Sequence, residues 1–293
     1  MKLITALLLL VTPALASAAP TASSRQSIDC HNCAEWNRPR APFALFGGSH
    51  YVGPEGLSVV AIDTGAGVIV IDAALPQSVD GIVANLRRQG LDIADVKYIA
   101  ISHPHFDHVG GVAALARLSG ATVLSTDAGV RALRQGNVPD DDPQAAFDDS
   151  MRFPPVAKLR SLDDGESITL GDTTLTLHAT PGHTPGGASW SWRDCEADRC
   201  IDLVYADSLT PIAAGNYRFS TGEREAVFRA SIARLRRLPC DLLVSAHPSF
   251  SRLFERQAQS ALIDSGACRA YAQDAAQALT KRLQQERQSA PAP

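Results

Sequence analysis

Four potential metal ligands fall within six consecutive residues, His103-Pro104-His105-Phe106-Asp107-His108. Imidazole nitrogens and carboxylate oxygens are ligands that suit zinc. The chain has 8 histidines in all, so the presence of three of them in six positions is unlikely to arise by chance. A shared loop can also serve two metal ions if alternate side chains point in opposite directions. The motif therefore predicts a metal centre.

Two more histidines stand in comparable places. His183 lies in Thr180-Pro181-Gly182-His183-Thr184 and His247 in Ala246-His247-Pro248, each after a predicted strand. Catalytic side chains collect in such loops. Five histidines and one aspartate would then form two three-ligand sites, each with a position open for water. The alternative, a polar surface loop that happens to be rich in histidine, is disfavoured by this arrangement.

The elements that must hold these loops alternate between strands and helices. Apolar runs and apolar periodicity predict, in the first half, strands at 57–64, 67–72, 96–102 and 121–125, with helices at 79–86 and 112–118. Leu118 is expected to face inward on the second of these helices. The second half repeats the plan, with strands at 167–178, 188–193, 201–206 and 241–246 and helices at 228–238 and 268–287. Residues 136–155, rich in Asp and Pro, predict a long loop, and long ordered loops are usually functional.

Two such halves predict an α/β protein in which two sheets pack face to face with helices outside, a four-layer αββα sandwich within a single domain. The composition, 45% hydrophobic and 20% charged, is that of a globular protein. The net charge of -4 gives no electrostatic reason to expect a nucleic-acid partner.

The amino terminus has the pattern of a secretory signal. Lys2 precedes an apolar run at 3–11, and Ala16-Ser17-Ala18 has the small residues of a cleavage site. The run is too short to span a bilayer. We therefore expect a signal peptide at 1–18, an N-terminal arm at 19–40 and the main domain at 41–293. The mature protein is expected to be exported and to have no membrane partner.

Six cysteines lie in the mature part, and an even count in an exported chain predicts disulfides. Cys195 and Cys200 flank a short polar stretch, which favours a local bridge. Cys240 and Cys268 can form a longer one. Cys30 and Cys33 could be a redox pair or half of a zinc ribbon, but their place in a polar arm favours a structural disulfide.

The histidine signature resembles that of the metallo-β-lactamase superfamily. The likeness rests on His103-x-His105-x-Asp107-His108 followed by His183 and His247, and it extends from about residue 35 to 287. It implies two Zn²⁺ per chain. The first ion would be held by His103, His105 and His183, and the second by Asp107, His108 and His247, with Asp107 also the catalytic residue.

The run Tyr205-Ala206-Asp207-Ser208-Leu209-Thr210 narrows the activity. In relatives such as glyoxalase II an Asp at this strand end bridges both metals, and in two subclasses of true β-lactamases a Cys binds the second. Ser208 here is similar to the third subclass of class B β-lactamases. One departure is that some relatives pair an arm cysteine with one near position 55, where this chain has Glu55.

The resemblance implies hydrolysis of the β-lactam amide bond of penicillins, cephalosporins and carbapenems by a metal-bound hydroxide. Such an enzyme would confer antibiotic resistance in the periplasm, and we expect a monomer. Ser208 and Thr210 are expected to contact the substrate carboxylate. Gln144 and Phe147, with Trp36 of the arm, could form the walls of the cleft.

Two aspartates leave alternatives open. If Asp207 bridges the metals, the protein would instead act on lactones or thioesters. Asp72, at a strand end beneath the ligand loop, either orients a ligand histidine or only forms a turn.

Overall fold

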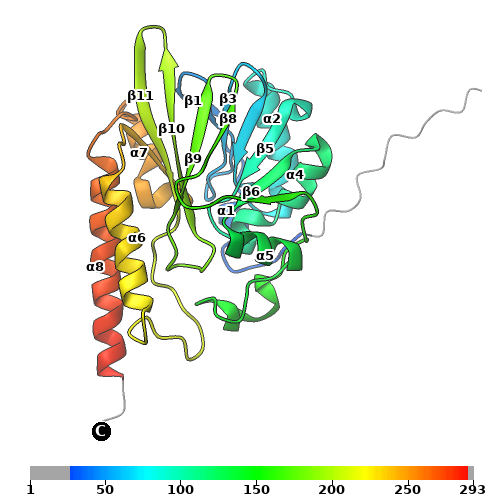
Figure 1. Cartoon of the computed structure of the whole chain (residues 1–293). Coiled ribbons are helices and arrows are strands. Elements are labelled where there is room, and N and C mark those ends of the chain that lie inside the picture. Colours follow the sequence, from blue (N-terminus) through cyan, green and yellow to red (C-terminus); the bar gives the residue numbers. More distant parts are fainter. Residues whose placement is uncertain (1–26, 290–293) are drawn as a thin grey trace, which may run out of the picture.

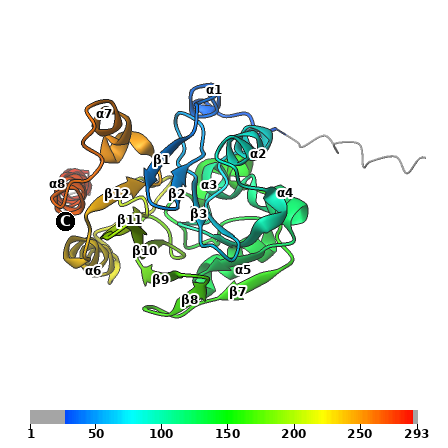
Figure 2. The same ribbon diagram turned by 90° about the horizontal axis from the view of Figure 1, so that it is seen from above.

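The computed structural model describes residues 27–289 and has two β-sheets packed face to face between two layers of helices (Figure 1). Seen from above, α6 and α8 lie outside one sheet, and α2, α4 and α5 lie outside the other (Figure 2). The predicted four-layer αββα sandwich is therefore confirmed.

The first sheet has seven strands in sequence order, antiparallel from β1 to β4 and parallel from β4 to β7. β4 is an apolar run buried along its whole length because both of its faces are covered, whereas β5 has an exposed Lys97 near its start. The strands are β1 Phe43–Phe46, β2 Ser49–Tyr51, β3 Val60–Asp63, β4 Val68–Ile71, β5 Val96–Ala100, β6 Thr122–Ser125 and β7 Leu159–Ser161.

The second sheet has five strands in the order β12-β11-β10-β9-β8, of which β11 and β12 are parallel. Its members are β8 Ser167–Leu170, β9 Thr173–Ala179, β10 Ala188–Glu196, β11 Arg199–Ala206 and β12 Leu242–Ser245. The stretch 167–178 is a hairpin of two strands, not the single strand predicted. The turn depends on Gly171, whose positive φ of 53° brings its backbone against Thr64 O, so that a Cβ would collide there.

The helices are α1 Cys33–Trp36, α2 Val79–Arg88, α3 Phe106–Val109, α4 Val112–Ser119, α5 Asp127–Gln135, α6 Arg224–Arg237, α7 Leu253–Ala258 and α8 Ala267–Gln288. Leu118 is 48% exposed, so its predicted inward orientation is wrong. The buried residues of α4 are confined to its first turn, 112–115, and residues 117 and 118 of its last turn are exposed. Helices α1, α3, α5 and α7 were not predicted.

The core between the sheets joins them directly beneath the histidine loop. Trp190 of β10 is fully buried, and its Nε1 donates a hydrogen bond to Ile101 O (3.0 Å). The backbone N–H of Ala188 donates to Ser102 O (2.7 Å). Two residues of the second sheet thus fix the backbone immediately before His103.

The predicted long loop is ordered and contains one short helical segment. Residues 136–155 leave α5 at Gly136, which has the left-handed φ of 74° that ends many helices. A 3-10 helix follows over Ala145–Met151. The loop reaches the histidine loop through Asp142, whose Oδ1 lies 3.1 Å from His105 Nε2, and then leads into the edge strand β7.

The arm lies against the main body from residue 27 onward. Ile28 and Gln77 exchange two hydrogen bonds (3.2 and 2.8 Å), and Ser78 Oγ donates to Asn37 Oδ1 (2.5 Å). The predicted signal peptide lies outside the described residues, and the boundaries at 18 and 40 remain predictions. Between residues 27 and 289, no helix combines the length and apolar character needed to cross a membrane.

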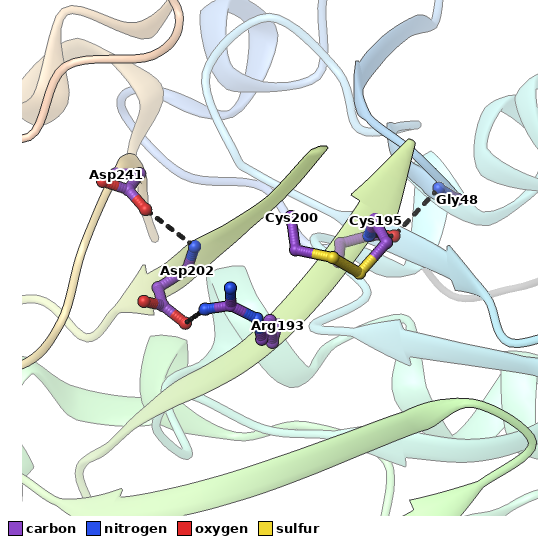
Figure 3. Close-up of a disulfide and its surroundings, with 7 residues drawn as sticks. Gly48, Arg193, Cys195, Cys200, Asp202 and Asp241 are labelled. Atoms are coloured by element: carbon purple, nitrogen blue, oxygen red, sulfur yellow. Dashed lines mark hydrogen bonds and ion pairs between the residues drawn. A yellow bond between two sulfur atoms is a disulfide. The ribbon is translucent and has the colours of Figure 1, made fainter. Parts of the chain in front are cut away.

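All three predicted disulfides are formed: Cys30–Cys33, Cys195–Cys200 and Cys240–Cys268. The second closes the end of the β10–β11 hairpin, beside the contact between Gly48 and Asp194 (Figure 3). The third links the start of β12 to the start of α8. Cys30 and Cys33 are thus bonded to each other, and a structural rather than a redox role for this pair stays a prediction.

The Cys240–Cys268 bridge should stabilise the protein more than the Cys195–Cys200 bridge, because their sequence separations are 28 and 5. Loop-closure entropy predicts losses of about 3.5 and about 2 kcal/mol in the free energy of unfolding for the two double serine variants. Urea denaturation of both variants measures the difference. Equal losses would contradict this entropic ranking.

Candidate metal centre

The histidine loop begins where β5 ends. Ser102 and His103 are buried, the chain is extended at His105, and the short helix α3 then carries Phe106–Val109. Gly110 and Gly111 allow a close return past β4. A Cβ on Gly111 would collide with Ala73 O, and one on Gly110 would lie 2.5 Å from Phe106 O. The two glycines therefore fix the turn that follows the ligands.

The first ligand cluster is formed by His103, His105 and His183, all nearly fully buried. One nitrogen of each lies within 4.8 Å of the others. The ring centroids are 4.8, 4.8 and 4.9 Å apart. The structure therefore brings together the three residues predicted for the first ion.

The second cluster is formed by Asp107, His108 and His247. His108 Nε2 lies 3.3 Å from His247 Nε2, and Asp107 Oδ2 lies 3.3 and 3.4 Å from these two nitrogens. His103 approaches the same group from the first cluster. The three residues predicted for the second ion are also brought together.

Three ligand histidines contact an oxygen through the nitrogen that faces away from the clusters. His105 Nε2 lies 3.1 Å from Asp142 Oδ1. His183 Nδ1 lies 2.8 Å from Thr210 O, and His247 Nδ1 lies 3.2 Å from Gly56 O. Such partners fix the tautomer and the orientation of a metal-binding imidazole.

Asp72 is placed to orient a fourth ligand, His108, whose Nδ1 lies 3.4 Å from Asp72 Oδ2. The Asp72 carboxylate also accepts from Ser102 N (2.7 Å), Ser102 Oγ (2.6 Å) and Tyr205 OH (2.8 Å). Its backbone has a positive φ of 59°, which Asp tolerates better than most residues. Asp72 therefore forms a turn and also lies against the ligand loop.

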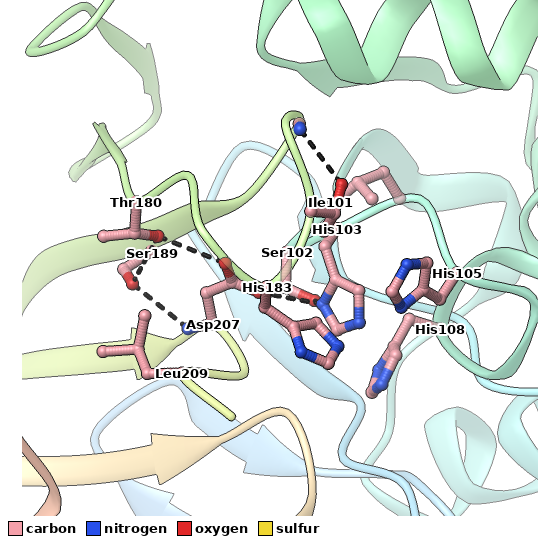
Figure 4. Close-up of polar contacts among 12 residues, drawn as sticks. Ile101, Ser102, His103, His105, His108, Thr180, His183, Ser189, Asp207 and Leu209 are labelled. Carbon is pink, nitrogen blue, oxygen red and sulfur yellow. Dashed lines mark hydrogen bonds and ion pairs between the residues drawn. The ribbon is translucent and has the colours of Figure 1, made fainter. Parts of the chain in front are cut away.

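Asp207 lies on the outer side of His103, with Oδ1 at 2.8 Å from His103 Nδ1. Figure 4 shows Asp207 on one side of this ring and His105 and His108 on the other. Thr180 Oγ1 donates to Asp207 Oδ2 (3.3 Å), and a side chain on Gly187 would collide with the same oxygen. Asp207 is therefore placed to orient His103 and does not lie between the two clusters, where a shared ligand would lie.

Burial and neighbouring charges shift the pKa values of four of the six ligands. Burial, and then the neighbouring histidines, lower the pKa of His103 well below its usual value and that of His183 to about 3. Burial opposes ionisation of Asp107, but the charge and hydrogen bond of His108 outweigh it and lower the Asp107 pKa. Neutral imidazole and ionised carboxylate are the forms that bind metal.

His108 is the exception among these ligands. Burial lowers its pKa, but the charges and hydrogen bonds of Asp107 and Asp72 outweigh burial and raise the pKa to about 10. A metal ion would therefore have to displace a proton from this residue.

Of the four residues predicted to contact the substrate, Gln144 and Thr210 contact histidines of the first cluster. Gln144 Nε2 lies 3.2 Å from His183 Nε2 and 3.5 Å from His105 Nδ1. Thr210 Oγ1 lies 3.0 Å from His183 Nδ1. Ser208 is buried, and among the described residues its hydroxyl has no hydrogen-bond partner. Phe147 is 44% exposed.

Several site residues were not predicted. Asp142 stands in a run of three aspartates, which in sequence resembles a solvated surface, yet it is 2% exposed. Gly56 contributes a backbone carbonyl, which leaves no sequence signal. Phe250, also not predicted, and Trp36, which was predicted for the cleft wall, lie beside His247, with ring centroids 5.0 and 5.3 Å away. Trp36 also lines a cavity of about 510 Å³ next to His247.

The donor chemistry of both clusters fits zinc. Each offers three nitrogen or carboxylate oxygen donors, two from the His103–His108 segment and one from a second strand-end loop. The buried, unpaired hydroxyl of Ser208 and the outer partners of the histidines are further features of a polar site prepared for a ligand.

Comparisons with known proteins place the chain among metal-dependent hydrolases. The family profile described as Metallo-beta-lactamase superfamily matches residues 52–247. MEM-A1, a subclass B3 metallo-beta-lactamase from a soil metagenome library, is 43% identical, with a TM-score of 0.84 over 87% of this chain and 100% of that one. MIM-1 from Novosphingobium pentaromativorans is 40% identical, with a TM-score of 0.83 over 87% and 94%.

Curated relatives are more distant. A hydroxyacylglutathione hydrolase of Methylococcus capsulatus is 29% identical over 169 residues, which cover 57% of this chain and 54% of that protein. The chain spans about half the length of the curated relatives it matches.

Replacing Asp72 by Asn should weaken zinc binding at the second cluster, because the outer nitrogen of His108, Nδ1, loses its negatively charged partner. We expect an affinity lower by about 10- to 100-fold, measured by competition with a chromogenic chelator. Asp95→Asn, at an exposed position, is the control and should bind zinc as the parent does. Unchanged affinity in Asp72→Asn would exclude an orienting role.

The metal-free protein should lose stability in acid, in part through His183. Its folded pKa of about 3 lies below the unfolded value, so the unfolded chain binds more protons as pH falls below 6.5. Between pH 7.5 and 5.0 this residue alone should remove about 2 kcal/mol from the free energy of unfolding.

The His183→Asn variant should therefore show a fall in stability smaller by about that amount, 2 kcal/mol. Urea denaturation of chelator-treated protein at the two pH values provides the measurement, with exposed His31→Asn as control. A parent and a His183→Asn variant with the same pH dependence would contradict the assignment.

Proposed function

Because this chain belongs to the metallo-beta-lactamase superfamily, we propose that it is a zinc-dependent β-lactamase of subclass B3 that opens the β-lactam ring of penicillins, cephalosporins and carbapenems. The observation that carries the proposal is the conjunction of two complete ligand clusters with 40–43% identity to B3 enzymes over nearly their whole length. An enzyme of this kind would confer antibiotic resistance.

Two Zn²⁺ per chain are assigned to the two clusters. His103, His105 and His183 would hold the first ion, and Asp107, His108 and His247 the second. When bound, such ions supply Lewis acidity and make water a nucleophile at neutral pH. No protein nucleophile is then required.

The chain's own residues position the ions and the substrate. Asp107 is assigned as the catalytic residue because its carboxylate touches both second-cluster histidines and is the one negative charge among the six ligands. The hydroxyls of Ser208 and Thr210 can donate hydrogen bonds to a substrate carboxylate. Gln144 and Phe147, from the 136–155 loop, are assigned to the wall of the cleft.

A second candidate function is hydrolysis of lactones or thioesters, as the hydroxyacylglutathione hydrolase relatives suggest. That reading requires Asp207 to lie between the two ions. Asp207 instead contacts the outer nitrogen of His103, which favours the β-lactamase proposal.

We also propose that the protein is exported to the periplasm after cleavage at residue 18 and acts as a monomer. The signal-like sequence at 1–18 supports export. The three disulfides support an oxidising compartment.

The purified mature chain, residues 19–293, should hydrolyse both a penicillin and a carbapenem. Loss of the β-lactam absorbance should stop on treatment with a chelator and return when zinc is added, because all six ligands serve metal binding. A fully zinc-loaded protein without β-lactam hydrolysis would refute the proposal and direct the assay to lactones and thioesters.

Replacing Asp107 by Asn should lower kcat/KM at least 100-fold, since the second cluster loses its negative charge, and a fall of this size corresponds to about 2.7 kcal/mol of transition-state stabilisation. Exposed Asp127→Asn, at the start of α5, is the matched control. Steady-state hydrolysis of one penicillin tests both variants. Parent-like kcat/KM in Asp107→Asn would remove this residue from the site.

A further inference from the structure

Two loops border the first ligand cluster without contributing any of the six ligands. Residues 139–151 carry Gln144 and Phe147, and residues 208–217 carry Ser208 and Thr210. Each loop is nevertheless attached to one histidine of the cluster. The attachments use the ring nitrogens that face away from the other ligands.

Asp142 attaches the 139–151 loop to His105. Its carboxylate is buried, and its oxygens lie 3.1 and 3.2 Å from His105 Nε2. Asp142 Oδ1 also accepts the backbone N–H of Gln144 (2.8 Å). One carboxylate therefore holds the imidazole ring and the turn that presents Gln144 to the cluster.

Thr210 attaches the 208–217 loop to His183 in the same manner, since its carbonyl oxygen lies 2.8 Å from His183 Nδ1. The two loops are joined to each other where Ala214 N donates to Pro143 O (2.9 Å). A Cβ on Gly215 would lie 3.0 Å from the Ala146 Cβ, so the loops are also in close packing contact.

These contacts form a chain that starts and ends at the first cluster. It runs from His105 through Asp142 and Pro143 to Ala214, and returns through Thr210 to His183. His105 and His183 face each other with ring centroids 4.9 Å apart. A metal ion bound to both imidazoles would connect the two ends of this series of contacts and make it a closed circuit.

We propose that Asp142 is a positioning residue that couples zinc binding at the first cluster to ordering of the 139–151 loop. This inference rests on the zinc ligation proposed above. An imidazole fixed by a metal donates its other N–H to a carboxylate in a charge-assisted hydrogen bond. The same carboxylate then holds the turn at Gln144, and by linkage the ordered loop raises the affinity for zinc in return.

Hydrogen–deuterium exchange of the mature chain, zinc-loaded and chelator-treated, tests the coupling. In the parent protein zinc should slow amide exchange at least tenfold in both loops, on the order of 1.4 kcal/mol of local opening free energy. In Asp142→Ala the response at 139–151 should be lost, while 208–217 retains its response through Thr210. Zinc affinity at the first cluster should fall by about 10- to 100-fold.

Two further variants separate coupling from a general structural role. Exposed Asp141→Asn changes the neighbouring carboxylate and should behave as the parent does. Asp142→Asn keeps one acceptor oxygen for Gln144 N–H but removes the charge opposite His105. This variant should preserve the fold of the turn and weaken zinc binding less than Asp142→Ala. If the alanine variant does not fold, the effect of zinc on amide exchange at 139–151 is measured in Asp142→Asn instead.

Equal zinc protection of 139–151 in the parent and in both Asp142 variants, with bound zinc verified by metal analysis, would overturn the inference. Loops in the parent that do not respond to bound zinc would overturn it as well. Neither result depends on a β-lactam, so a failure of the coupling is distinguishable from a failure of the proposed activity. A parent chain that binds no zinc would overturn both.

Discussion

The contact on the outer nitrogen of each ligand histidine is the constraint on which the rest of the site depends. A metal-binding imidazole must present a chosen nitrogen in a chosen direction, and only a partner on the opposite nitrogen can fix both. Here two of those partners, Asp72 and Asp207, directly follow β4 and β11, and the others lie in loops, so both sheets are needed to orient one centre. The Trp190–Ile101 hydrogen bond serves the same end, because it fixes the backbone from which the ligands project.

The electrostatics of the site follow from this packing. Crowding several imidazoles into a buried space disfavours their protonated forms, and Asp107 provides the compensating negative charge in the second cluster. The two clusters are therefore unequal. The first consists of three histidines with oxygen partners outside, whereas the second pairs a carboxylate with two histidines and holds His108 in an ion pair with Asp107. Both clusters can bind a divalent cation. Removal of the cation leaves only histidines in the first cluster, whereas it leaves the His108–Asp107 ion pair in the second.

The ligands were predictable from sequence because their signal is local: four of six lie in His103–His108, and the other two follow apolar strands. The sandwich was predictable because its buried strands are continuous apolar runs. What the sequence did not reveal depends on tertiary contacts. Asp142 looks like surface until its loop folds over His105, Gly56 acts through its backbone, and the strand pair at 167–178 depends on a glycine turn against Thr64. Leu118 shows the same limit, because the apolar periodicity of α4 does not reveal that only its first turn is buried.

Zinc titration of the metal-free mature chain tests the central claim most directly, with bound zinc and β-lactam hydrolysis measured in the same samples. Two clusters of three donors predict that the chain binds two zinc ions and that hydrolysis reaches its maximum when both are bound. Saturation at two ions with no hydrolysis at any point, or hydrolysis that persists in protein shown to be free of metal, would contradict the account.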